Sequence, residues 1–104
     1  MAQFDVYQNL QSETSASIPF LLDLQSDLLD PLATRVVAPL LLATEVEEAA
    51  MTLMPTFEVD DVAVVLSTPE LAGVSRSQLG KRVASLSGYR SEILRALDML
   101  FTGI

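Results

Sequence analysis

The residues of this sequence that could do chemistry are a group of carboxylates and one arginine in its first half. Asp23, Asp27 and Asp30 lie close together, and Thr34 and Arg35 follow shortly after them. Neighbouring carboxylates suit a hard cation such as Ca²⁺, but the glycine and the bidentate glutamate of an EF-hand loop are missing here. Arg35 with Thr34 could instead stabilise a phosphate, as expected of a ribonuclease that works without histidine.

Other catalytic chemistry is poorly represented in the chain. It has no histidine and no cysteine, so the commonest general acid–base group and the usual zinc ligands are missing. The sequence also lacks a phosphate-binding loop, a dinucleotide-binding glycine pattern and a nucleophile elbow. A hydrolase is therefore disfavoured, although the phosphate interpretation of Arg35 stays open. We expect no cofactor and no metal ion.

The charge of the chain is divided unevenly along its length. Residues 1–75 hold twelve acidic residues and a single arginine, a formal charge of −11, whereas residues 76–104 carry +3, and the net charge is −8. Direct binding to nucleic acid needs a cationic surface, so we do not expect it. The basic segment permits an acidic partner to dock near the C-terminus. A solvated helix face with scattered arginines is the simpler interpretation.

The length and composition fit a single domain that spans residues 1–104. Half of the residues are hydrophobic, which is enough for a modest core. No apolar run approaches the ~20 residues needed to span a bilayer. The first residues also lack the positive charge and apolar stretch of a signal peptide. We therefore expect a cytoplasmic protein with no membrane partner.

Short apolar runs predict several β-strands in the first two thirds of the chain. These runs lie at residues 4–8, 18–25, 35–42, 52–59 and 62–66. Asp60-Asp61 joins the last two runs and suits a hairpin turn. Pro39 predicts an edge, a bulge or a strand end. Residues 43–51 have a helix-forming composition, which predicts a short helix.

The last segment predicts an amphipathic helix, because its apolar residues recur every three or four positions. Ser87 suits its N-cap, and Gly103 suits the glycine that ends such a helix. Residues 75–86 before it stay ambiguous, since Gly80 weakens a helix there. Strands followed by a helix predict an α+β fold, a small antiparallel barrel with a helix beside it. The apolar stripe of the helix packs on the sheet or against its symmetry mate in a dimer.

Five segments spread over nearly the whole chain carry a family likeness: QFDVY at the start, LQSDLLD at 24–30, RVVAPL at 35–40, VASLS at 83–87 and the terminal MLFTGI. In this order they resemble the CcdB family, the toxins of toxin–antitoxin modules. The most specific part is QSD-x-x-D together with F-x-G-I at matching distances. The resemblance implies an SH3-like antiparallel β-barrel with a long C-terminal α-helix, the fold of CcdB and MazF proteins, in a homodimer.

The function that the resemblance implies is binding, so the protein would not be an enzyme. CcdB-like toxins inhibit DNA gyrase by binding its A subunit and trapping the cleaved-DNA complex. A CcdA-like antitoxin with a disordered acidic tail neutralises them. One alternative is a CcdB-fold protein that has lost gyrase poisoning or binds another partner. Another is a MazF-like ribonuclease, which shares the fold and would use Arg35.

The resemblance also assigns residues of this chain to two surfaces. The positions that match the family's gyrase contacts are Leu28, Leu29, Asp98, Thr102, Gly103 and Ile104. The candidates for the dimer interface are Leu97, Leu100 and Phe101, of which Phe101 is expected in the core rather than on the target. The family has tryptophan at position 102, where it stacks on an arginine of gyrase. Thr102 offers no aromatic ring for such a contact.

Overall fold

The computed structural model describes residues 1–46 and 53–103. In this part of the chain the elements are β1 (Asp5–Asn9), β2 (Phe20–Asp23), β3 (Thr34–Leu42), β4 (Thr56–Val59), β5 (Val62–Leu66), β6 (Ala72–Ser75), β7 (Leu79–Ser85) and α1 (Arg90–Thr102). Short 3₁₀ turns lie between them, among them η1 (Asp27–Leu29) and η3 (Thr68–Glu70). Within the described residues, no helix is long and apolar enough to cross a membrane.

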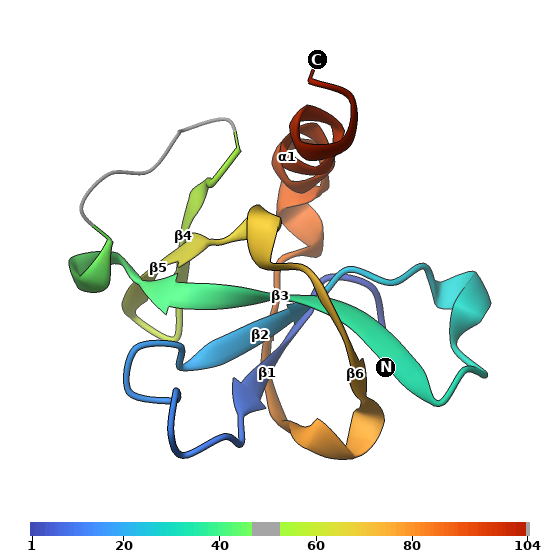
Figure 1. The fold of residues 1–104 in the computed structure, drawn as a ribbon, viewed down its shortest axis with the longest axis horizontal. Helices are drawn as coiled ribbons and strands as arrows, with labels where there is room; N and C mark the ends of the chain where they lie inside the picture. The colour runs from blue at the N-terminus through green and yellow to red at the C-terminus, as the bar shows by residue number, and fades with distance from the viewer. Residues whose placement is uncertain (47–52, 104) are drawn as a thin grey trace.

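The strands form one curled sheet in which each pair is antiparallel. Its order is β4-β5-β3-β2-β1-β7, and β6 pairs with β3 as well. The long strand β3 lies at the centre, because its first residues pair with β6 and its last residues pair with β5. The sheet makes a half-barrel, and α1 stands beside it and carries the C-terminus (Figure 1). The expected α+β fold is therefore confirmed.

Pro39 lies inside β3, where it pairs with Leu21 of β2, so the expectation of a strand edge or end is wrong. The structure nevertheless tolerates it for a related reason. On its other side β3 changes partner at this point, since β6 pairs as far as Val37 and β5 begins at Leu40. The missing N–H of Pro39 therefore interrupts no strand ladder. Its carbonyl accepts a hydrogen bond from the Ser67 N–H at 3.0 Å.

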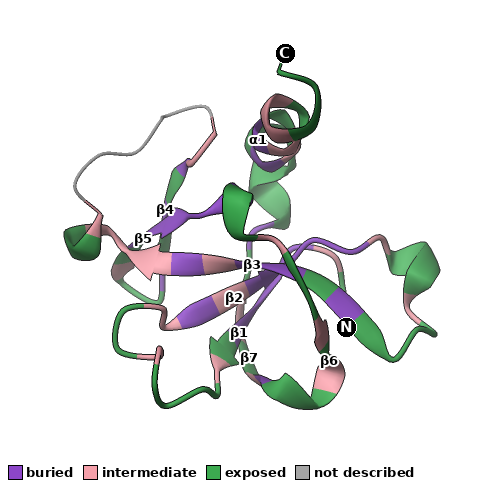
Figure 2. Cartoon of the chain, viewed as in Figure 1, coloured by how far each residue is buried: buried purple, intermediate pink, exposed green. Residues whose placement is uncertain are grey.

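The central strands β2 and β3 carry consecutive buried residues, Leu22–Asp23 and Val37–Ala38, and buried residues are purple in Figure 2. Successive side chains of a strand point to opposite faces, and one face forms the main core together with α1. This core contains Phe4, Val6, Phe20, Leu22, Leu24, Ala38, Leu40, Phe57, Val59, Val64, Leu66, Leu86 and Ile93. The opposite face lies inside the half-barrel and carries a smaller cluster of Tyr7, Val37 and Leu79.

The hairpin at Asp60-Asp61 is confirmed, because these residues join β4 to β5. Their φ angles are +51° and +65°, as a two-residue type I′ turn requires. The ambiguous residues 75–86 form mainly β7, which pairs with β1. Gly80 permits a close approach there, since a Cβ would lie 2.8 Å from the Leu10 side chain and 2.9 Å from Gln8 Cβ. The glycine that weakened a helix prediction is needed by a strand.

The helix expected at residues 43–51 is wrong at its start. Ala43–Glu45 makes a single 3₁₀ turn, and Val46 is already extended. Residues 47–51 lie outside the described part of the chain. Thr44 and Val46 are β-branched, and such residues disfavour helix more than the alanines and glutamates around them.

The beginning of the C-terminal helix also differs from the prediction. Ser87–Tyr89 forms a 3₁₀ turn, and α1 starts at Arg90 with Tyr89 as its N-cap. The N–H of Ser87 instead donates to Ser85 Oγ at 3.2 Å. The predicted end is confirmed, since Gly103 has a left-handed φ of +75° directly after Thr102.

Candidate protein-binding surface

Two exposed apolar segments lie on the surface of the described chain. The first is the pair of η1 leucines, Leu28 and Leu29, which are 90% and 48% exposed. The second is the helix tip, residues 99–103, where Phe101 is 70% exposed. Single exposed leucines are ordinary in folded proteins. These segments become candidates for binding because each is held in a fixed conformation.

The conformation of the η1 leucines depends on the buried side chain of Gln25. Gln25 Nε2 donates to the carbonyl oxygens of Leu29 and Thr34 at 3.2 Å and 3.1 Å. Its Oε1 accepts from the N–H of Val36 at 3.0 Å. One side chain therefore joins the η1 turn to the first residues of β3. Without it, partly buried backbone groups would lose their partners.

The next two residues of the QSD sequence fix the other side of the turn. Ser26 Oγ accepts from the Leu28 N–H at 3.2 Å, which is the geometry of a helix cap. Asp27 Oδ1 accepts from the N–H of Gln3 at 2.7 Å, close to the start of β1. Each residue of QSD thus has a separate structural task, and together they present the η1 leucines to solvent.

We expect Gln25→Ala to lower the free energy of unfolding by about 1–3 kcal/mol, because three hydrogen bonds to partly buried backbone groups are lost. Urea unfolding measures the loss, and hydrogen exchange should accelerate at the Val36 amide. Gln11→Ala is the matched control, because Gln11 is exposed. A loss no greater than that of the control would show that Gln25 does not hold the turn.

A buried ion cluster lies behind the η1 turn. Arg35 is fully buried, and its Nη2 and Nε lie 2.5 Å and 3.0 Å from Asp23 Oδ2. Its Nη1 lies 3.2 Å from Asp30 Oδ1, which also accepts from Arg76 Nη2 at 3.2 Å. The guanidinium of Arg35 is thus enclosed by carboxylates and offers no donor to a phosphate. The ribonuclease interpretation loses the residue on which it depended.

The same contacts account for the three clustered aspartates. Asp23 and Asp30 pair with Arg35, and Asp27 accepts from a backbone amide. In the described residues, no group of three or more acidic, histidine or cysteine side chains is arranged to hold a metal ion. The aspartates therefore stabilise the turn.

Tyr7 shares the interior with this cluster, and its hydroxyl lies 3.4 Å from Asp5 Oδ2. Burial raises the pKa of Tyr7, and the charges of Asp5 and Asp23 raise it further, against a smaller opposite effect of Arg35. A raised folded-state pKa gives stability that is complete below the unfolded value of 10.0. That stability is lost as the pH rises through the folded pKa.

We therefore expect Tyr7→Phe to remove part of the alkaline loss of stability. Urea midpoints of the two proteins, measured from about pH 8 to about pH 11, should converge as Tyr7 of the wild type ionises. A difference between the midpoints that stays constant over this range would contradict the assignment.

The helix tip extends beyond the part of α1 that packs on the sheet. Ile93 and Ala96 are buried, and Leu97 packs partly against the main core. Leu100 is half-buried, whereas Phe101 points to solvent. The expectation that Phe101 lies in the core is therefore wrong for this chain. An exposed phenylalanine beside a half-buried leucine is typical of an interface residue.

The last described residues close the helix compactly. Thr102 Oγ1 donates to the carbonyl oxygen of Asp98 at 2.7 Å, so its hydroxyl is turned back onto the helix. The Gly103 N–H donates to the carbonyl oxygen of Met99 at 3.0 Å. Asp98 is exposed one turn earlier. Ile104, which was predicted to contact the target, lies outside the described residues.

A single chain does not bring the two segments together. In Figure 1 the turn η1 lies at the right of the view, away from the C-terminal end of α1 at the top. The helix packs beside η3, at Thr68–Glu70. The predicted target contacts therefore form two separate patches on one chain.

A family model described as CcdB protein matches residues 3–103. The chain belongs to the CcdB family. The match includes both the η1 leucines and the helix tip. Membership of the CcdB family implies that the chain is the toxin of a toxin–antitoxin module.

The structure adds two features of this CcdB-family chain that sequence reasoning missed. Leu32 is 49% exposed close to the η1 leucines, and Gln25 holds their turn. Gln25 ends the apolar run of residues 18–25, and polar side chains buried beside such runs are usually hydrogen-bonded. Leu32 follows Pro31 in a turn and gave no such signal.

Proposed function

We propose that this CcdB-family chain inhibits DNA gyrase in the cytoplasm by binding its A subunit and trapping the cleaved-DNA complex. The observation that carries the proposal is the closed helix tip, where Thr102 and Gly103 are exposed and Gly103 ends the helix. Residues held on a fixed support lose little entropy on binding. The proposed act is binding, with no catalytic step.

The η1 leucines support the same proposal as a second contact patch. Leu28 is almost fully exposed, although two hydrogen bonds fix its turn: Gln25 Nε2 donates to the carbonyl oxygen of Leu29, and Ser26 Oγ accepts from the Leu28 N–H. A partner that covered Leu28 would remove apolar surface worth about 1.5–3 kcal/mol for one large aliphatic side chain. The patch is therefore able to add measurably to affinity.

The test is a cleavage assay with purified gyrase, supercoiled DNA and the protein. We expect cleaved DNA to accumulate, and Leu28→Ser to require several times more protein for the same effect. Leu10→Ser is the matched control, because Leu10 is an exposed leucine on the loop after β1. No cleaved DNA at micromolar protein would refute the proposal.

We propose that the protein acts as a homodimer joined through the end of α1. Leu100 and Phe101 leave apolar surface uncovered in one chain, and Leu97 lies between them and the core. Light scattering should give twice the mass of the chain, and Phe101→Glu should shift the protein to the monomer. A monomeric wild type at micromolar concentration would contradict this arrangement.

The second candidate function is that of a CcdB-fold protein that has lost gyrase poisoning or binds another partner. It is favoured by Thr102, whose hydroxyl is bonded within the helix. Position 102 then presents only a methyl group to a partner. The substitution Thr102→Trp separates the two candidate functions.

We propose that a CcdA-like antitoxin with an acidic tail binds the basic C-terminal segment. Lys81 of β7 and Arg95 of α1 are exposed there, whereas the rest of the chain is strongly acidic. Opposite charges across such an interface make the affinity depend on salt. In titrations with an acidic antitoxin peptide, the measured affinity should fall as the sodium chloride concentration rises. An affinity that does not change with salt would contradict the proposal.

A further inference from the structure

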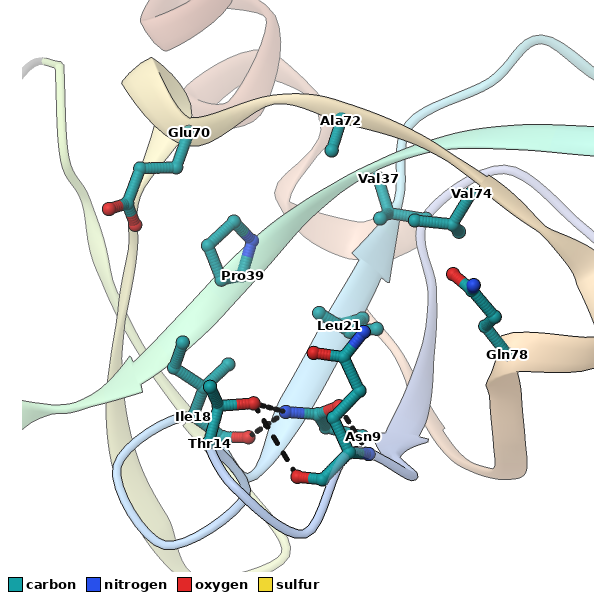
Figure 3. Close-up of a pocket in the computed structure, with 11 residues that line it drawn as sticks. Asn9, Thr14, Ile18, Leu21, Val37, Pro39, Glu70, Ala72, Val74 and Gln78 are labelled. Atoms are coloured by element: carbon teal, nitrogen blue, oxygen red, sulfur yellow. Dashed lines mark hydrogen bonds between the residues drawn. The ribbon is translucent and has the colours of Figure 1, made fainter.

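A pocket of about 180 Å³ opens on the inner face of the half-barrel. Its floor is apolar and is formed by Leu21 of β2, Val37 and Pro39 of β3, and Val74 of β6 (Figure 3). These side chains lie on the face of the sheet opposite to the main core and α1. The pocket is therefore separate from the helix tip on which the proposed function depends.

One wall of the pocket is fixed by Asn9. Its Nδ2 donates to Thr14 Oγ1 at 3.0 Å and to the carbonyl oxygen of Ile18 at 2.9 Å, and its Oδ1 accepts from the Gln11 N–H at 3.0 Å. The side chain thereby folds the loop between β1 and β2 into a wall, as the dashed lines in Figure 3 show. A pocket with a fixed wall is preformed, and a ligand does not have to order the loop when it binds.

The strand β6 supplies a backbone edge beside the pocket. It pairs with β3 along one edge, and among the described strands none pairs with its other edge. Ala72 and Val74 alternate with Gly73 and line the pocket. A peptide that paired with this edge in an extended conformation would direct alternate side chains to the same face as Ala72 and Val74.

The charge of the pocket restricts its ligand. Glu70 of η3 is the charged residue among the residues that line it, and within the described residues it makes no ion pair. We propose that the pocket binds an extended segment of a partner protein by one aliphatic side chain, with a basic residue beside it that pairs with Glu70. The pocket volume suits one side chain, since a cavity of about 150 Å³ holds a benzene molecule.

The segment proposed for this pocket is basic and aliphatic, whereas the proposed antitoxin tail is acidic. The pocket also lies apart from the surface proposed to bind gyrase. The pocket lies on the inner face of the sheet, so a segment bound there would leave the helix tip uncovered. The toxin would then engage two partners of opposite charge at once. This inference does not depend on whether gyrase is the target.

The test uses a blocked pentapeptide probe with leucine at its centre, lysine on each side and threonine at both ends. We expect it to shift the backbone amide signals of Leu21, Val37 and Val74 in the ¹⁵N-labelled protein, at peptide concentrations up to about 10 mM. A dissociation constant of about 1 mM would then give near-saturation. A probe with serine in place of leucine, and a probe with glutamate in place of lysine, should shift these signals much less.

Two variants test the site itself. Glu70→Gln should lower the affinity of the lysine probe roughly two- to fivefold, as expected for an exposed ion pair. Glu58→Gln on β4 is the control at an exposed position. Ala72→Leu fills the pocket from an exposed position and should abolish binding without lowering the thermal midpoint.

Three results would overturn the proposal. They are an absence of shifts with the leucine probe, equal shifts with the serine or glutamate probe, and unchanged affinity in both variants. Shifts of the pocket signals with protein concentration alone would show that a second copy of the chain occupies the pocket, which would overturn it as well.

Discussion

Arg35→Met should lower the free energy of unfolding by about 3–5 kcal/mol, the largest stability effect expected in this chain. The substitution leaves Asp23 fully buried without the guanidinium that contacts it at 2.5 Å and 3.0 Å. Methionine fills similar space, so the loss measures the stranded charge rather than a cavity. Urea unfolding near neutral pH gives the value.

The pH dependence of this loss has a definite sign. Burial already raises the pKa of Asp23, while the hydrogen bonds from Arg35 lower it. Removing Arg35 raises the pKa of Asp23 further, so the variant takes up a proton more easily and the loss should shrink as the pH falls. Asp23→Asn combined with Arg35→Met should recover part of the stability at neutral pH.

The matched control for Arg35 is Arg76→Met. Arg76 also pairs with Asp30 at 3.2 Å, but its side chain is 37% exposed. Its substitution should cost at most about 1 kcal/mol, as is typical of exposed ion pairs. Equal losses in the two variants would mean that burial of the charge does not decide the stability of the cluster.

Thr102→Trp should raise affinity for the gyrase A subunit at least about tenfold, which corresponds to ~1.4 kcal/mol. A tryptophan buried at an interface removes a large aromatic surface from water, and stacking on a cation adds about 0.5–2 kcal/mol. Position 102 is exposed at the helix tip, so the larger side chain meets no core. Surface plasmon resonance with the immobilised A subunit measures the change.

Thr102→Leu is the matched control for the aromatic contact. Both substitutions remove the hydrogen bond from Thr102 Oγ1 to the carbonyl oxygen of Asp98, so this loss cancels in the comparison. A gain with tryptophan alone assigns the effect to the ring. If tryptophan brings no gain and the wild type does not trap cleaved DNA, the chain has lost gyrase poisoning, which is the second candidate function. A wild type that already traps cleaved DNA strongly would refute that candidate.

Local chemistry predicted the parts of the fold that depend on a few neighbouring residues. The turn at Asp60-Asp61 and the helix end at Gly103 follow from side chains that tolerate left-handed backbone, and both are confirmed. The strand β7 could not be predicted in this way. Gly80 argued against regular structure locally, and only the close approach of β1 explains its presence.

The exposed leucines of the proposed binding surface were predictable from the sequence, whereas the role of Arg35 was not. Resemblance to the CcdB family selected Leu28 and Leu29, and the structure exposes both. The phosphate interpretation of Arg35 followed from residue type alone. Whether an arginine faces solvent or a carboxylate depends on strand pairing across the sheet. The residues next to Arg35 in the sequence do not predict that it pairs with Asp23 of β2.

The pairing of β1 with β7 joins Asp5 to Ser85, which lie far apart in the sequence. A growing polypeptide therefore cannot complete this sheet before Ser85 is made, and β1 keeps an unpaired edge until β7 emerges. Folds dominated by such distant pairings form slowly compared with helical bundles of similar size. The helix tip follows β7 in the chain, so the proposed contact at the helix tip becomes available only after this distant pairing can form.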